Sequence, residues 1–243
     1  QNFSLPVSVK HDSLLTECYN ILVKGGHIDV ELGTKLFESP NLSGISALAD
    51  LIKKSRFGNY VYFNDNLHVN TTNICVLACR FCAFRKGPRH NDAYALSVDE
   101  YLHRIKPYSE IIDEVHSVGG LHPDWTVDFY EELYRAAKKT FPHIHIKSLT
   151  AVEVKHIASR SGLTVEETLS RLKLAGLDSL PGGGAEILVD SVRNRICRGK
   201  ESSEEYLAIH EIAHGLGIKT NCTMLFGTVE TVRERAIHLH KLR

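Results

Sequence analysis

The 243-residue sequence lacks three features that mark specialised classes of protein. No uninterrupted apolar run approaches 18 residues, so we expect no membrane span. Residues 1–20 have no basic start followed by an apolar stretch, so no secretory signal is visible. The net charge is zero, because 29 Lys and Arg balance 29 Asp and Glu. No excess of basic residues therefore indicates nucleic-acid binding. What remains is a chain with 43% apolar residues, which is enough for a substantial core.

A disulfide framework is also absent, but the distribution of the cysteines is informative. Six cysteines in a chain of this length do not make a disulfide framework. Three of them, Cys75, Cys79 and Cys82, form a C-x3-C-x2-C array on a loop that follows a strand-like run. Three reactive thiols so close together are typical of a reducing compartment, so we expect a cytoplasmic protein. Thiolates at this spacing can converge on a [4Fe–4S] cluster, leaving one iron free for an outside ligand.

Two other interpretations of the array stay open, namely three unrelated buried cysteines and a zinc site. Structural zinc sites usually combine C-x2-4-C with a second pair of ligands further along the chain. Here the next cysteine is Cys197, which has no partner at short spacing. The ligand spacing therefore favours the iron–sulfur cluster.

A second metal-binding pattern, H-E-x-x-H, occurs at His210, Glu211 and His214. The third histidine of one zinc-protease pattern would fall at position 220, which is Thr220. The apolar stripe of this predicted helix consists of Tyr206, Ile209, Ile212, Ala213 and Leu216. Both histidines lie well away from the centre of that stripe. We therefore expect a solvated helix flank, with a zinc hydrolase as the distant alternative.

Periodicity divides the chain into a helical segment, residues 1–64, and an α/β segment, residues 65–243. Residues 12–57 have the apolar spacing of three helices. After them, strand-like runs alternate with helical patterns, which predicts five βα units on a parallel sheet. The predicted strands are Leu67–Ile74, Glu110–Val118, His143–Leu149, Leu177–Leu180 and Lys219–Phe226. The predicted helices are Val98–Ile105, Val127–Phe141, Thr164–Ala175, Glu204–Leu216 and Thr231–Arg243.

Unusual residues follow the predicted strands, at the edge where parallel α/β folds gather their chemistry. The second strand is followed by Gly119 and Gly120, and the third by Glu153. The fourth strand is followed by three glycines, Gly182–Gly184, and then Glu186. Glycines at a strand end allow a ligand to approach the backbone closely. Simpler interpretations are an ordinary turn for the glycine pair and a helix-capping role for Glu153.

The cysteine array, together with Phe81 just before its third member, resembles the radical S-adenosylmethionine (SAM) enzymes. The resemblance implies that the free iron chelates the amino and carboxylate groups of SAM. It also implies that the reduced cluster passes an electron to the sulfonium and releases a 5′-deoxyadenosyl radical.

Within that superfamily the chain resembles the aminofutalosine synthase group of menaquinone biosynthesis over residues 12–243. Its relatives are dehypoxanthine futalosine cyclase and the deazaflavin (FO) synthases. The shared runs are His68–Cys75, Cys79–Phe84, Leu180–Glu186, Met224–Gly227 and Arg235–Arg243. Two stretches, Val118–Pro123 and His145–Glu153, look more like the synthase than the cyclase. Thr228 departs from the pattern, because many relatives carry His there.

The resemblance implies a partial (β/α)6, TIM-like barrel with an N-terminal helical extension. Only five βα units are visible, and the chain ends at Arg243 inside a helical pattern, so we expect a sequence truncated before its sixth strand. The implied reaction adds the 5′-deoxyadenosyl radical to the enol-ether double bond of 3-[(1-carboxyvinyl)oxy]benzoate. Rearrangement and loss of CO2 then give 6-amino-6-deoxyfutalosine, with SAM consumed as a co-substrate. The sequence alone does not separate radical addition from hydrogen abstraction.

The resemblance also implies roles for individual residues. The expected cofactor-binding residues are Phe81, Phe84, Gly119, Gly120, Glu153, Gly182, Gly183, Gly184 and Glu186. A substrate with two carboxylates needs cationic or hydrogen-bonding groups. Candidates that follow strands or point into the barrel are His68, Asn70, His122 and Lys147. An electron donor such as flavodoxin or ferredoxin is the expected protein partner.

Overall fold

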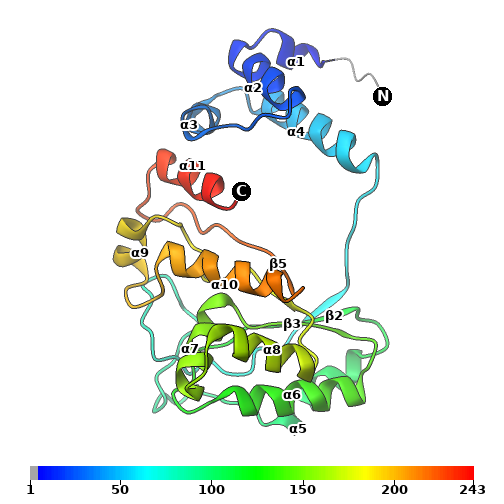
Figure 1. The fold of residues 1–243 in the computed structure, drawn as a ribbon, viewed down its shortest axis with the longest axis vertical. Coiled ribbons are helices and arrows are strands. Elements are labelled where there is room, and N and C mark those ends of the chain that lie inside the picture. Colours follow the sequence, from blue (N-terminus) through cyan, green and yellow to red (C-terminus); the bar gives the residue numbers. More distant parts are fainter. Residues whose placement is uncertain (1–4) are drawn as a thin grey trace. The chain divides into compact units, whose positions relative to one another are not determined.

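The computed structural model describes residues 5–243 and contains a five-stranded parallel sheet (Figure 1). The strands lie side by side in chain order, each hydrogen-bonded to the next. Their bounds are β1 Asn66–His68, β2 Glu114–Ser117, β3 His145–Ser148, β4 Ser179–Leu180 and β5 Lys219–Thr220. This arrangement confirms the predicted α/β fold class, with a parallel sheet of barrel type that is open on one side.

Residue contacts divide the chain into two compact units. The barrel unit comprises residues 64–229, and the helical unit combines the residues up to 63 with residues 230–243. The barrel helices are α5 Val98–Ile105, α6 Val127–Thr140, α7 Ala151–Ser161, α8 Val165–Ala175, α9 Asp190–Ile196 and α10 Ser203–Gly215, with a 3-10 turn, Lys106–Tyr108. The helical unit contains α1 Val7–Lys10, α2 Ser13–Val23, α3 Val30–Glu38, α4 Leu42–Phe57 and α11 Val232–Lys241.

The final helix differs most from the sequence-based division. We assigned Thr231–Arg243 to the fifth βα unit, but the contacts group it with the N-terminal helices. In that unit α11 packs against α3, where the missing side chain of Gly33 leaves room for Ala236. An ion pair of 2.9 Å between Arg233 and Glu31 joins the same two helices.

The first strand is shorter than expected because the chain turns away from the sheet. The expected strand Leu67–Ile74 ends at His68 in the structure. Residues beyond it pair with the segment 86–96 instead, including an antiparallel bridge between Thr72 and Ala95. The cysteine loop therefore leaves the sheet already attached to a second backbone segment.

Helix α7 was not predicted, although its capping signal is in the sequence. Thr150 accepts a hydrogen bond from the amide of Glu153, and the Glu153 carboxylate accepts one from the amide of Thr150. This reciprocal capping box satisfies two amides that a helix start leaves unpaired. Gly162, with φ 65°, ends the helix in the left-handed conformation that glycine tolerates. The short helix α9 was also not predicted.

One face of the sheet packs on helices and forms the barrel core. Val115 and Ile146 are buried there together with Tyr101 and Tyr134. The Tyr134 hydroxyl donates to Ser148 Oγ over 2.7 Å, so the strand's polar side chain is satisfied within the core. The opposite face carries polar side chains.

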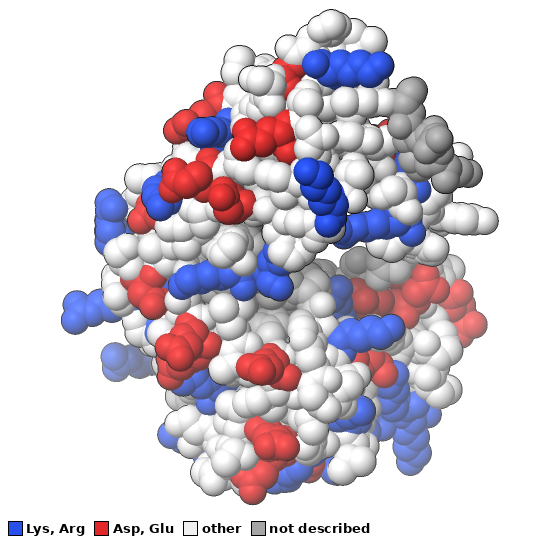
Figure 2. Space-filling model, turned by 45° about the horizontal axis from the view of Figure 1, so that its top comes forward, with Lys and Arg blue, Asp and Glu red and all other residues white. Residues whose placement is uncertain are grey.

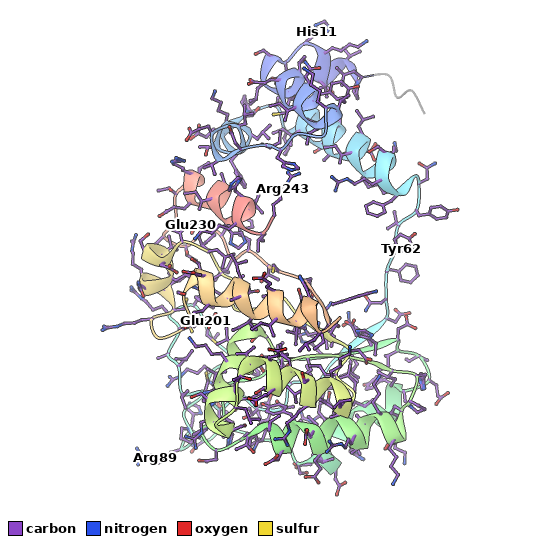
Figure 3. All side chains as sticks on the ribbon, viewed as in Figure 1. His11, Tyr62, Arg89, Glu201, Glu230 and Arg243 are labelled. Carbon is purple, nitrogen blue, oxygen red and sulfur yellow. The ribbon has the colours of Figure 1, made fainter. Side chains whose placement is uncertain are left out.

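The helical unit has its own core and a segment of exposed apolar residues. Val9, Leu15, Cys18 and Leu48 are buried together, so Cys18 belongs to the core of this unit. The segment after α4, residues 60–63, carries Tyr, Val, Tyr and Phe side chains that are 73–88% exposed; Figure 3 labels Tyr62 there.

Charge is spread evenly over the face drawn in Figure 2, where Lys and Arg alternate with Asp and Glu. Among the described residues, no helix is both long enough and apolar enough to cross a bilayer.

Candidate functional site

The cysteine loop is held by backbone hydrogen bonds to three distant segments. The Cys75 amide donates to Lys86 O over 3.2 Å, and the next amide donates to Leu121 O over 3.1 Å. The Arg80 amide donates to Ile196 O over 2.8 Å, which ties the loop to the end of α9. The loop is therefore positioned by the barrel rather than by its own sequence.

The three thiols line one cavity of about 180 Å³ near the carboxyl ends of the strands. Six expected cofactor-binding residues line it too: Phe81, Phe84, Gly119, Gly120, Glu153 and Gly184. The other three, Gly182, Gly183 and Glu186, do not. Lining residues that the sequence analysis did not single out include Thr150, Val152 and Lys200.

The thiol arrangement fits a cluster better than a single metal ion. Cys75 and Cys79 are half-buried and Cys82 is exposed, and none of the three forms a disulfide. A single zinc ion would need its sulfurs within about 2.3 Å of one point. Within residues 5–243, no three Cys, His, Asp or Glu side chains are gathered closely enough for that. A [4Fe–4S] cluster spreads its thiolates over a larger body, which the shared cavity accommodates.

The glycines beside the cavity have a packing role that the sequence did not reveal. A side chain on Gly120 would place its Cβ 2.1 Å from Ile74 O. One on Gly182 would meet the Asn221–Cys222 backbone at 2.6 Å, and one on Gly184 would meet the Val152 side chain at 2.3 Å. These glycines therefore allow protein segments to approach one another, whereas we had expected them to admit a ligand.

Glu153 both caps α7 and lines the cavity. Its Oε2 accepts hydrogen bonds from the amide and hydroxyl of Thr150, and its Oε1 accepts one of 2.8 Å from the Gly119 amide. Burial raises the pKa of this carboxyl to about 7, although these hydrogen bonds oppose the shift. The capping interpretation of Glu153 is thus confirmed, and its ligand-binding role stays a prediction that its place in the cavity lining permits.

Lys200 was missed by the sequence analysis. Its ammonium forms a buried ion pair with Glu186 and lies 5.5 Å from the centre of the Phe81 ring. Burial would lower the pKa of Lys200, but the Glu186 carboxylate outweighs it and the net shift is upward. Lys200 is therefore a cation beside the thiols. Burial raises the pKa of Cys79, and the charge of Lys200 partly offsets that effect. Glu186 thus acts beside the site through Lys200.

Arg193 holds the backbone of the glycine loop in place. Its guanidinium is 3% exposed and donates to the carbonyls of Gly184 and Ala185. It also pairs with the Glu201 carboxylate over 2.9 Å, near the start of α10, where Figure 3 labels Glu201. No local pattern in the sequence marked this residue.

The four expected substrate-binding residues do not form one group. His68 on β1 and Lys147 on β3 lie on the polar face of the sheet. The strand between them, β2, places His116 beside both in the register. Asn70 accepts a hydrogen bond from the Val118 amide over 3.3 Å and so links the ends of two strands. His122 stacks on Trp125, with ring centres 4.4 Å apart, and does not line the cavity.

The H-E-x-x-H pattern requires a correction. We expected both histidines on a solvated helix flank, which holds for His214 but is wrong for His210. The His210 ring is 4% exposed, packs on Tyr206 and has no hydrogen-bond partner among the described residues. Burial lowers the pKa of His210 to about 4. The side chain is therefore a neutral core histidine.

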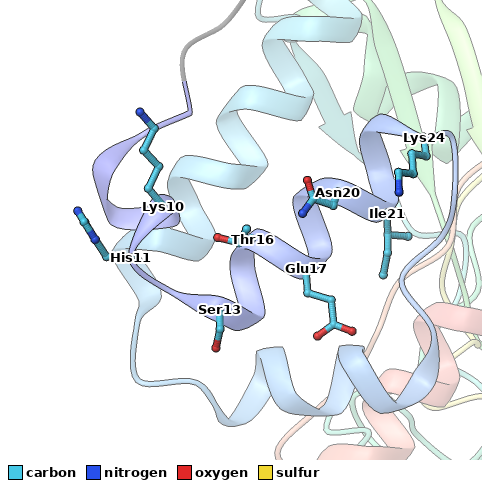
Figure 4. A pocket seen from close by; sticks show the side chains of 8 residues that line it. All are labelled: Lys10, His11, Ser13, Thr16, Glu17, Asn20, Ile21 and Lys24. Carbon is cyan, nitrogen blue, oxygen red and sulfur yellow. The ribbon is translucent and has the colours of Figure 1, made fainter.

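A second hollow lies in the helical unit and carries no such chemistry. It measures about 670 Å³ and is lined mainly by one side of α2 (Figure 4). Figure 4 shows polar side chains such as Lys10, Glu17 and Lys24 that point in different directions. The smaller cavity with the three thiols is the better candidate site.

Comparisons with known proteins agree with the cysteine array. The family model of the radical SAM superfamily matches residues 69–242 of this chain. Aminodeoxyfutalosine synthase of Thermus thermophilus is 40% identical over 223 residues, 91% of this chain and 60% of that protein. Cyclic dehypoxanthine futalosine synthase of Streptomyces coelicolor is 40% identical over 224 residues, 90% of this chain and 56% of that protein. The chain thus spans a little over half the length of these relatives.

A solved structure shows the same fold at low sequence identity. Methylornithine synthase superposes with a TM-score of 0.71 at 16% identity, covering 92% of this chain and 63% of that one. Enzymes of the radical SAM superfamily use a [4Fe–4S] cluster and SAM. Because the superfamily match covers most of the sequence and includes the three cysteines, this chain belongs to the radical SAM superfamily.

Proposed function

We propose that this chain is the radical SAM core of an aminodeoxyfutalosine synthase in menaquinone biosynthesis. The observation that carries the proposal is the single cavity lined by Cys75, Cys79, Cys82, Glu153 and Lys200. A [4Fe–4S] cluster bound to the three thiols would supply the electron that cleaves SAM into methionine and a 5′-deoxyadenosyl radical.

The reaction joins that radical to 3-[(1-carboxyvinyl)oxy]benzoate. A bond forms between the 5′ carbon and the enol-ether double bond. Rearrangement with loss of CO2 and of one electron, which the cluster would take back, gives 6-amino-6-deoxyfutalosine. Phe81 and Phe84 cover the cavity with apolar surface, which limits access of water. The Glu153 carboxylate is positioned to accept hydrogen bonds from the ribose or the ammonium group of SAM.

Cyclic dehypoxanthine futalosine synthase is the second candidate, and a deazaflavin synthase half is the third. Overall identity does not discriminate, because the synthase and cyclase relatives are both 40% identical to this chain. Our preference rests on Val118–Pro123 and His145–Glu153. Both stretches border the cavity, through Val118–Leu121 and through Thr150, Val152 and Glu153.

The remaining assignments extend the proposal. The electron donor would be a small redox protein such as flavodoxin or ferredoxin, and the compartment would be the cytoplasm, where thiols stay reduced. Gly182 and Gly183 would support the cavity floor through their packing rather than by direct contact.

Product analysis separates the candidates. The reconstituted protein is incubated anaerobically with SAM, reductant and each candidate substrate, and the products are read by mass. A covalent adduct of 5′-deoxyadenosine with the enol ether supports the synthase. Free 5′-deoxyadenosine, or its regeneration as SAM, means that the enzyme abstracts hydrogen, as a cyclase does. A zinc hydrolase would show neither iron absorbance nor SAM cleavage.

Cysteine substitutions test the ligand assignment itself. Single changes of Cys75, Cys79 or Cys82 to alanine are expected to remove the brown iron–sulfur absorbance and all SAM cleavage, because three thiolates hold the cluster. Cys197→Ala and Cys222→Ala are the matched controls and should keep their iron content. Loss of iron in either control, with retention in the three loop variants, would reject the assignment.

A further inference from the structure

The polar face of the sheet carries a row of basic side chains that crosses all five strands. The register pairs His68 with His116, His116 with Lys147, Lys147 with Ser179, and Ser179 with Lys219. Residues paired across neighbouring parallel strands project to the same face of the sheet. Four of the five positions are therefore His or Lys, and none carries a carboxylate.

The three residues of β1, β2 and β3 in this row have no counter-ion from the protein. The His68 and His116 rings lie 4.4 Å apart between centres, at a tilt of 39°. Within residues 5–243, neither ring nor the Lys147 ammonium takes part in an ion pair or a side-chain hydrogen bond. Basic side chains gathered without a counter-ion make the local potential positive, so an external anion would stabilise this arrangement.

The local electrostatics agree with this interpretation. Burial lowers the pKa of His116, and the charges of His68 and Lys147 lower it further. Glu114 precedes His116 by two residues in β2 and so lies on the same face. Its charge raises the pKa of His116 but does not cancel the downward shift. His145 pairs with Glu114 in the register, and its ring is already hydrogen-bonded to Ser179 Oγ over 2.7 Å.

The row lies beneath the cavity that holds the thiols. Val118 follows His116 by two residues, so it belongs to the same face, and it lines the cavity. At a strand rise of 3.2–3.4 Å per residue, His116 is about 7 Å below the cavity wall. A rigid aromatic molecule bound to the row would therefore reach the place where the radical forms.

We propose that His68, His116 and Lys147 form a carboxylate-binding subsite that holds the benzoate end of the substrate. This inference rests on the proposed function. The benzoate carboxylate is the one that the product keeps, and it lies at the opposite end of the molecule from the reacting double bond. With that carboxylate on the row, the enol ether points toward the cavity. Lys147 supplies the charge and the two imidazoles supply donors, which makes the hydrogen bonds charge-assisted.

The test compares the enol-ether substrate with an analogue whose ring carboxylate is replaced by a carboxamide. Lys147→Met and His116→Gln should raise the KM for the acid at least tenfold and leave the KM for the amide nearly unchanged. SAM binding should stay as in the wild type, and Lys147→Arg should restore most of the affinity. Lys139→Met, on the exposed side of α6, is the matched control and should change neither constant.

Three outcomes would overturn the subsite: an unchanged KM for the acid in both variants, an equal loss for acid and amide, or the same loss in Lys139→Met. Failure of the proposed function looks different, because then the wild type forms no adduct with the acid. Calorimetric titration with benzoate and benzamide tests the row in that case as well. Benzoate should bind better than benzamide to the wild type, and Lys147→Met should remove the difference. If the wild type shows no preference for benzoate, the subsite is rejected.

Discussion

Gly120 constrains the candidate site most strongly among single residues, because the cysteine loop passes directly over it. A Cβ at this position would lie 2.1 Å from Ile74 O and 3.0 Å from Cys75 Cβ. Backbone atoms cannot move aside as the end of a flexible side chain can. The ligand loop must therefore shift if this residue gains even a methyl group.

We predict that Gly120→Ala lowers both the stability and the iron content of the reconstituted protein. Overpacking of this kind costs about 1–3 kcal/mol, and the displaced loop would no longer present Cys75 correctly. Urea unfolding and iron analysis measure the two effects. Gly87→Ala is the control, because an added Cβ there meets open space. Normal iron content in Gly120→Ala would contradict the packing role.

His210 is a second residue whose behaviour follows from its burial. Its pKa is lowered to about 4 by burial, from an ordinary value of 6.5. Between pH 6.5 and pH 4 the unfolded chain binds a proton at this histidine and the folded protein does not. The free energy of unfolding therefore falls as the pH is lowered from 6.5 toward 4. Between pH 7.5 and pH 5 the loss from this one group amounts to about 2 kcal/mol.

Replacing His210 with phenylalanine should therefore weaken the acid sensitivity of the barrel unit. The free energy of unfolding of the wild type is expected to fall by about 2 kcal/mol more than that of His210→Phe between pH 7.5 and pH 5. Other titrating groups cancel in this difference. The exposed His103 supplies the control, because His103→Phe makes the same substitution outside the core. An equal fall in all three proteins would show that His210 is not buried as described.

At the scale of elements, the short helix α9 connects the glycine loop to the rest of the barrel. Its Arg193 spans from the carbonyls of Gly184 and Ala185 to the carboxylate of Glu201. The guanidinium donates five hydrogen bonds in all, to the backbone of Gly184, Ala185 and Glu201 and to the Glu201 carboxylate. The fourth strand ends at Leu180, so the loop geometry depends on α9 more than on the sheet.

Arg193→Met is expected to destabilise the protein by about 3–5 kcal/mol, because it leaves Glu201 as a buried unpaired charge. Denaturant unfolding gives the magnitude. The exposed Arg198, in the turn after the same helix, provides Arg198→Met as a control with an expected change below about 0.5 kcal/mol. A similar small effect for both variants would remove the anchoring role.

At the scale of the whole molecule, the helical unit is discontinuous in sequence. Residues 230–243 return to the helices formed by the first 63 residues. Ala236 is 4% exposed on α11 and lies against Gly33 of α3, where an added Cβ would be 3.4 Å from the Ala236 Cβ. A charge at position 236 would be buried without a partner.

Ala236→Asp should therefore loosen the helical unit while the barrel unit stays folded. Amide hydrogen exchange read by mass spectrometry should show faster exchange in α2, α3 and α11, with β2 and β3 unchanged. The control His240→Asp places the same charge on the exposed side of α11 and should have only a small effect. Faster exchange in β2 and β3 as well would mean that the two units unfold together.

The sequence by itself determined the features that depend on residues close together in the chain. The cluster ligands span eight positions, and five helices begin with a reciprocal capping box that spans four residues. Alternation of strand and helix patterns was sufficient to predict the parallel sheet. Spacing, capping and periodicity are local, so they can be read without knowledge of the packing.

Only the tertiary structure decided which distant residues meet. It brought Lys200 and Glu186 beside the thiols, placed His116 between His68 and Lys147, and set Gly120 against Ile74. It also buried His210, which helical periodicity had placed away from the centre of the apolar stripe. Such contacts depend on strand register and on the choice of packing face. A shift of one residue in register would turn every side chain of a strand to the other face, and no short stretch of sequence encodes that choice.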